Sequence, residues 1–135
     1  MYRTVVTTDT APLPKGPYHQ AILTADTLYV AGQGPIDPRT GAVVAGSFEE
    51  QARLTFANLR AILFAANTTM AEAVKVTVYL ADLGNFEKMN EVYRTFFSEP
   101  YPARTTVGAQ LLSGIAIEVD CIAVRLTQAV GSPAR

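Results

Sequence analysis

The sequence contains very few residues that could form disulfide bonds or bind a structural metal. Its 135 residues include one cysteine, Cys121, and one histidine, His19. A single cysteine cannot form an internal disulfide, and this pair falls short of the four ligands of a structural zinc site. The N-terminal residues also lack the apolar core of a signal peptide. We therefore expect a cytoplasmic protein with no metal site.

An excess of positive charge and long apolar runs are also absent. The formal net charge is -1 and there is no basic stripe, so binding to nucleic acid is not indicated. No apolar run reaches the roughly 18 residues of a membrane helix, so no membrane partner is expected. Hydrophobic residues, in contrast, make up 49% of the chain, which is more than a small monomer needs to bury. The length fits one domain, residues 1–135, and no repeat or linker divides it.

Local patterns predict six strands and two helices in the order β-β-β-α-β-α-β-β. One helix starts at the capping box of Ser47 and Glu50 and runs to about residue 67, with its buried face at 3.6-residue spacing. The tail 128–135 is polar and is expected to fray. The predicted strands are 3–8, one that begins shortly after Tyr18, 28–33, 74–80, 104–111 and 115–126, and the second helix is 82–97. This is an α+β domain with one sheet.

The two faces of this sheet are expected to have different partners. Six strands make a sheet roughly 25–29 Å wide, and two helices of about 10 Å diameter cover only one face of it. In the strand 115–126 the face of Ile117 is fully apolar, and the opposite face, with Glu118, is still half apolar. A solvated face would be more polar. We therefore predict that a second subunit covers that face in a closed homo-oligomer.

Two charged residues stand on otherwise apolar strands, Arg104 and Glu118. The short turn at 112–114 predicts that their strands are antiparallel neighbours, with both side chains on one face. A guanidinium suits bidentate binding of a carboxylate, and a carboxyl group among apolar residues can act as an acid or base near neutral pH. A salt bridge from Arg104 to Glu118 or Asp120 explains the same residues equally well.

Other candidate residues each have a structural explanation beside the functional one. Tyr18 follows Gly-Pro in a loop, where its phenol reaches a cleft or simply packs. Asn90 borders the apolar face of the second helix, where we expect structural support. Asp120 shares a strand face with Glu118 and either raises its pKa or pairs with a cation. Cys121 is expected to be buried and inert.

Several separated motifs resemble the RidA/YjgF family of enamine and imine deaminases over nearly the whole chain. Gly-Pro-Tyr-His-Gln-Ala, Val-Ala-Gly-Gln-Gly-Pro-Ile-Asp-Pro and Tyr-Pro-Ala-Arg occur in the family's order. The matching positions are 16–21, 30–38, Thr40, Gly41, Gln51, Asn58, Leu59, 74–80, Asn90, Phe96, Phe97, 101–104 and 117–119. The resemblance implies a chorismate-mutase-like α+β fold, a homotrimer and clefts between subunits.

The resemblance also implies a reaction. Small 2-imino acids or enamines are hydrolysed to 2-keto acids and ammonia without a cofactor. In this chain Arg104 would hold the substrate carboxylate, and Glu118 would activate water and move a proton to nitrogen. Tyr18 would line the cleft from a neighbouring subunit, and backbone N–H groups near Gly32 and Thr106 would help to bind the ligand. Ala31 and Asn90 complete the set of expected substrate-binding residues.

Three departures from the family pattern leave alternatives open. Deaminase members usually carry serine at the position of Ala31 and cysteine at that of Thr106, and the turn at 113–114 is one residue shorter here. The alternatives are a different enamine, such as an aminoacrylate or aminomuconate, or a non-catalytic protein that binds keto acids. The RNA-cleaving activity attached to some members gains no support from a net charge of -1.

Overall fold

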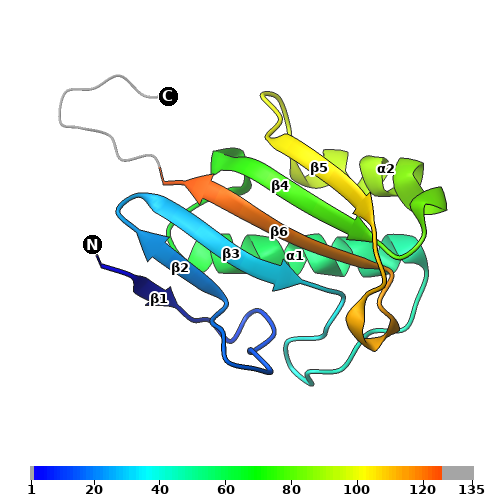
Figure 1. Ribbon diagram of the computed structural model, residues 1–135, viewed down its shortest axis with the longest axis horizontal. Helices are drawn as coiled ribbons and strands as arrows, with labels where there is room; N and C mark the ends of the chain where they lie inside the picture. The colour runs from blue at the N-terminus through cyan, green and yellow to red at the C-terminus, as the bar shows by residue number, and fades with distance from the viewer. Residues whose placement is uncertain (1, 126–135) are drawn as a thin grey trace.

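The computed structural model describes residues 2–125, which form one six-stranded sheet with two α-helices behind it (Figure 1). The predicted α+β architecture is therefore confirmed. The strands are β1 Thr4–Val6, β2 Ala21–Thr24, β3 Thr27–Gln33, β4 Ala73–Leu80, β5 Ala103–Gly108 and β6 Ile117–Val124. The helices are α1 Phe48–Ala65 and α2 Phe86–Phe96, with short 3-10 turns at Met70–Glu72, Leu83–Asn85 and Leu112–Gly114. The end of the predicted last strand at Leu126 and the tail 128–135 lie outside the described residues. No helix among residues 2–125 is long and apolar enough to cross a membrane.

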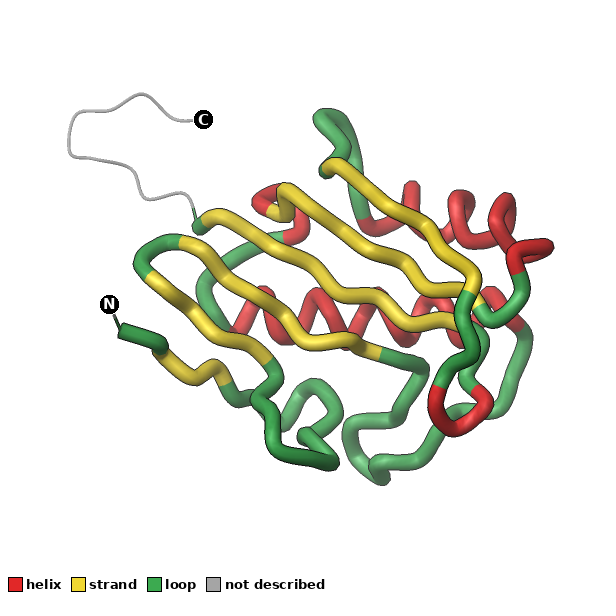
Figure 2. Tube along the Cα trace, viewed as in Figure 1, coloured by secondary structure: helices red, strands yellow, loops and turns green. Residues whose placement is uncertain are grey.

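The strand order is β1-β2-β3-β6-β4-β5, and it corrects one prediction. β5 and β6 are not neighbours: β5 pairs in parallel with β4, and β6 lies between β3 and β4 (Figure 2). The connection 109–116 crosses the end of β4 instead of closing a hairpin. The Ala109 N–H donates to Leu80 O at 2.9 Å, and the Ala81 N–H donates to Ala116 O at 3.1 Å. The sequence predicts a hairpin here because the connection between β5 and β6 is short and contains a compact bend at Leu112–Gly114. That bend does not join adjacent strands.

The two helices cover one face of the sheet with an apolar and aromatic layer. α1 begins with the predicted capping box, in which Ser47 Oγ accepts from the Glu50 N–H. Phe56 of α1 is fully buried, and its ring lies 5.7 Å from that of Tyr93 on α2. The buried face of α1 expected at 3.6-residue spacing is confirmed, because Ala52, Phe56, Leu59, Leu63 and Ala66 are all buried. On α2, helical spacing from Met89 and Tyr93 would place Phe86 inward, but it is 38% exposed.

Two strands depart from the strict alternation that their sequences predict. The register of β3 against β6 shifts between Val30 and Gln33, which identifies a β-bulge. Gln33 consequently joins Leu28 and Val30 on the buried side, and Gly32 turns to the opposite side. A second shift at the start of β4 leaves Val74 exposed, against prediction.

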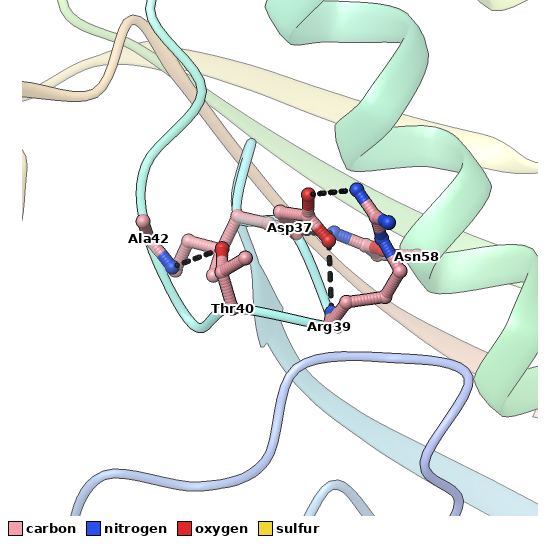
Figure 3. Close-up of polar contacts among 6 residues, drawn as sticks. Asp37, Arg39, Thr40, Ala42 and Asn58 are labelled. Carbon is pink, nitrogen blue, oxygen red and sulfur yellow. Dashed lines mark hydrogen bonds and ion pairs between the residues drawn. The ribbon is translucent and has the colours of Figure 1, made fainter.

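A buried amide fixes the loop that follows β3. Asn58 on α1 is 2% exposed, and its Nδ2 donates to the carbonyls of Gly34 at 3.0 Å and Ile36 at 2.9 Å. Figure 3 shows Asn58 beside the turn that follows, in which Asp37 accepts from the Arg39 N–H at 2.8 Å. Asn58 thereby sets where β3 ends and the loop begins.

Candidate active site

Arg104 lies on the edge strand β5, and its register partner on β4 is Val76. Val76 is fully buried beneath the helices, so Arg104 projects to the same helix-covered side. Its guanidinium carbon lies 4.7 Å from the centroid of the Tyr93 ring and 5.6 Å from that of Phe86. A guanidinium nitrogen also lies 3.9 Å from Sδ of Met89. No carboxylate among residues 2–125 forms an ion pair with Arg104, so its planar fork is available for an anionic ligand.

A cavity of about 360 Å³ opens beside this guanidinium. Its lining residues are Asn90, Tyr93, Arg94, Tyr101, Pro102 and Arg104. Tyr93 is only 4% exposed, and its hydroxyl has no hydrogen-bond partner in the described part of the chain. Burial raises the pKa of Tyr93 to about 12, with the charge of Arg104 acting in the opposite direction. The phenol is therefore neutral at neutral pH and is a buried donor without an acceptor.

Glu118 lies on β6, in the middle of the sheet, with Tyr79 of β4 as its register partner. This pair is on the face away from the helices. The next residue on β6, Val119, is fully buried beneath the helices, and successive side chains of a strand point to opposite faces. A methyl group on Gly32 would overlap the Glu118 carboxylate, so any larger residue there would require the Glu118 side chain to move. Burial raises the pKa of Glu118 above its ordinary value, and the negative charge of Asp120 raises it further.

Tyr18 and Gly32 line the same small hollow, of about 50 Å³. Tyr18 is half exposed, and its hydroxyl accepts the Lys15 backbone N–H at 3.3 Å. The backbone N–H of Ala31 is already bound, because it donates to the carbonyl of Gln20 at 2.9 Å. Gly32 therefore lies between Tyr18, with which it lines the hollow, and the Glu118 carboxylate, which it contacts. The backbone N–H of Ala31 is not available to a ligand.

The structure divides the expected site residues into two groups on opposite faces of the sheet. The arginine half-site comprises Arg104, Asn90 and Thr106; Thr106 pairs with the fully buried Val78 and so shares the side of Arg104. The glutamate half-site comprises Glu118, Gly32 and Tyr18.

This division overturns the prediction that Arg104 and Glu118 share one face. Strand β4 separates their strands, and their side chains leave the sheet on opposite sides. A salt bridge from Arg104 to Glu118 or Asp120 within one chain is therefore excluded. The two half-sites can act on one ligand only if they come from different copies of the chain.

Several residues that shape the site were missed at the sequence level. Tyr93 and Arg94 on α2 both line the cavity, and no sequence motif distinguishes them from other residues of the helix. Gln51 on α1 is also buried: its Oε1 accepts from the Ala116 N–H at 3.0 Å and its Nε2 donates to the carbonyl of Val44 at 3.1 Å. It ties the segment before β6 to the loop after β3. An amide on the buried face of a helix is a usable signal, because buried amides require partners.

Comparison with known proteins identifies relatives along the whole described fold. The sequence pattern of the family described as Endoribonuclease L-PSP matches residues 8–125. A RutC family protein from Pyrococcus horikoshii is 46% identical over 90% of this chain and 97% of its own. The human 2-iminobutanoate/2-iminopropanoate deaminase is 38% identical over 93% of this chain and 92% of its own.

Solved structures agree with these relatives. RidA from the Antarctic bacterium Psychrobacter superposes with a TM-score of 0.87 and 38% identity, covering 90% of this chain and 99% of that one. TdcF from E. coli, solved with bound serine, superposes with a TM-score of 0.86 and 36% identity, covering 91% of this chain and 99% of that one. With the matched pattern, the sequence identities and the shared fold, the chain belongs to the Endoribonuclease L-PSP family, which includes the RidA/YjgF proteins.

Proposed function

We propose that this protein is a cofactor-free hydrolytic deaminase of 2-imino acids and their enamines, with active sites between neighbouring copies of a homotrimer. The observation that carries the proposal is the separation of the half-sites. An unpaired guanidinium lies on one face of the sheet, and a carboxyl group with a raised pKa lies on the other. Each is incomplete alone, and together they supply a carboxylate clamp and an acid–base group.

Arg104 is suited to hold the substrate carboxylate. Two parallel N–H···O bonds from its fork fix both the position and the plane of the carboxylate. Its stacking on the Tyr93 ring restricts the guanidinium before the ligand arrives, which lowers the entropy cost of binding. The serine bound to TdcF, with its carboxylate, is a ligand of the size proposed here.

Glu118 supplies the proton transfers. As the base it accepts a proton from water while the water oxygen bonds to the imine carbon, and the C=N double bond becomes single. It then returns that proton to the nitrogen, which gives a carbinolamine. Glu118 next takes the proton of the carbinolamine hydroxyl and passes it to the same nitrogen, so that the C–N bond breaks, ammonia leaves and the C=O bond of the 2-keto acid forms. A carboxyl group whose pKa is raised by burial is a better match to both steps than an exposed one. Tyr18 borders the same hollow and shapes it around the substrate.

The test is imine turnover by the intact protein. An amino-acid oxidase generates 2-iminopropanoate in place, and semicarbazide traps what is not hydrolysed. The wild type should suppress semicarbazone formation. Arg104→Ala should reduce the effect on the order of a hundredfold, because it removes a charge-assisted bidentate contact. The matched control is Arg53→Ala, which removes an exposed arginine of α1 that does not line the cavity beside Arg104.

Loss of suppression in Arg104→Ala with retention in Arg53→Ala is the expected result. Failure of the wild type to suppress semicarbazone formation with several imino acids would contradict the deaminase assignment. Ligand-induced thermal stabilisation without ammonia release would instead identify a binding protein for small carboxylates.

A further inference from the structure

The cavity beside Arg104 contains a second arginine that the proposed reaction does not use. Asn90 and Arg94 are four residues apart on α2, so they lie on one side of that helix, and both line the cavity. Arg104 borders it from β5. The exposed Arg94 and the partly buried Arg104 therefore both border one hollow of about 360 Å³.

No carboxylate in the described part of the chain forms an ion pair with Arg94 or Arg104. Among residues 2–125 the one ion pair joins Arg39 to Asp37, far along the chain from this cavity. Arg94 in the last turn of α2 interacts favourably with the helix dipole, but that interaction does not require it to line a cavity. Two like charges around one hollow repel each other, and an anionic ligand that contacts both removes the penalty.

The size of the cavity points to the same kind of ligand. The cavity has the volume of about a dozen water molecules, far more than a three-carbon imino acid fills.

We infer that the site favours 2-imino acids with a second carboxylate, the imines of acidic amino acids. Arg104 holds the carboxylate next to the imine carbon, and Arg94 holds the carboxylate at the other end. This assignment of substrate class rests on the proposed deaminase function, but the selectivity of binding can be measured without turnover.

The experiment compares a dicarboxylate with a monocarboxylate in two assays. Turnover is measured with 2-iminoglutarate and 2-iminopropanoate, each generated by an amino-acid oxidase. Binding is measured by calorimetry with the stable keto acids 2-oxoglutarate and 2-oxobutanoate. The variants are Arg94→Gln, Arg94→Lys as the conservative replacement that retains the charge, and Arg53→Gln as the matched control on α1. Thermal melts check that each variant is folded.

The wild type should prefer the dicarboxylate in both assays. Arg94→Gln should reduce the ratio of dicarboxylate to monocarboxylate by about two- to fivefold, the value of a solvent-exposed charge pair. Arg94→Lys should restore part of that ratio, and Arg53→Gln should leave it unchanged. An equal effect of Arg94→Gln on both ligands, or no effect, would overturn the inference. Absence of turnover with any imine, together with a binding ratio that depends on Arg94, would overturn the deaminase proposal and support the dicarboxylate preference.

Discussion

The Glu118 carboxyl group has neighbours that act on it in distinct ways. Gly32 leaves room for it against β3, and burial raises its pKa. Asp120 lies two residues along the same strand face and adds a negative charge nearby. Tyr79 donates its hydroxyl hydrogen to Asp120 Oδ2 at 2.9 Å, which holds that carboxylate in place. Lys75, on the same face, donates to Thr105 at 2.6 Å. The Asp120 carboxylate, whose charge raises the pKa of Glu118, is therefore held in a fixed position by the hydrogen bond from Tyr79.

We predict that Asp120→Asn moves the acidic limb of the pH–rate profile to lower pH. In the proposed mechanism Glu118 must be ionised to act as a base, so activity should be lost as pH falls through its raised pKa. Removing the charge of Asp120 lowers that pKa, while burial still keeps it above the ordinary value. Asparagine retains an oxygen that accepts from Tyr79, so the geometry is preserved. The measurement is kcat/KM against pH, with Glu87→Gln on the exposed start of α2 as the control. An unchanged limb in Asp120→Asn would show that the charge of Asp120 does not reach Glu118.

At the scale of elements, local patterns predicted where the helices and strands lie in the sequence, but not which strands are adjacent in the sheet. The capping box fixed the start of α1 because its hydrogen bonds are local. β6 lies between β3 and β4 because the connection 109–116 passes the end of β4. Short-range sequence patterns carry no information about such a path. The bulge in β3 turned Gly32 to the face of Glu118, although strict alternation placed it opposite. Both failures concern the candidate site, where the regular pattern is interrupted.

The loops at the ends of these elements depend on buried amides, and Asn58→Ala tests this dependence. The substitution removes the Nδ2 donor from the carbonyls of Gly34 and Ile36, although the Gly34 carbonyl still accepts the Ile36 N–H at 2.8 Å. We expect a loss of about 1–3 kcal/mol in the free energy of unfolding, since the Ile36 carbonyl loses its side-chain donor. Denaturant titration measures it. Asn85→Ala, which removes an amide without a side-chain capping bond, should change stability by much less. Equal effects of the two substitutions would indicate that the loop is held by packing alone.

At the scale of the whole molecule, the sheet has one face without a helix. Both helices lie behind the sheet in Figure 1, and the other face presents Tyr29 at 49% exposure and Val107 at 36%. Ile122, the register partner of Tyr29, shares that face. Apolar side chains on an open sheet face favour contact with another copy, as the half-apolar pattern of β6 predicted. Glu118 lies on this face, so assembly and active-site formation are parts of one proposal.

Complementation between two inactive variants tests that proposal directly. Arg104→Ala lacks the arginine half-site, and Glu118→Gln lacks the acid–base group of the glutamate half-site. When the two proteins are unfolded together and refolded as a mixture, a site formed by Arg104 of one copy and Glu118 of another is intact at some interfaces. In a closed ring with random assembly, about a quarter of the sites recover both residues, so about a quarter of wild-type activity should return. Refolding each variant alone is the control, and light scattering gives the number of copies. If the mixture stays as inactive as its components while assembling normally, no site combines Arg104 of one copy with Glu118 of another, and the shared-site mechanism would have to be abandoned.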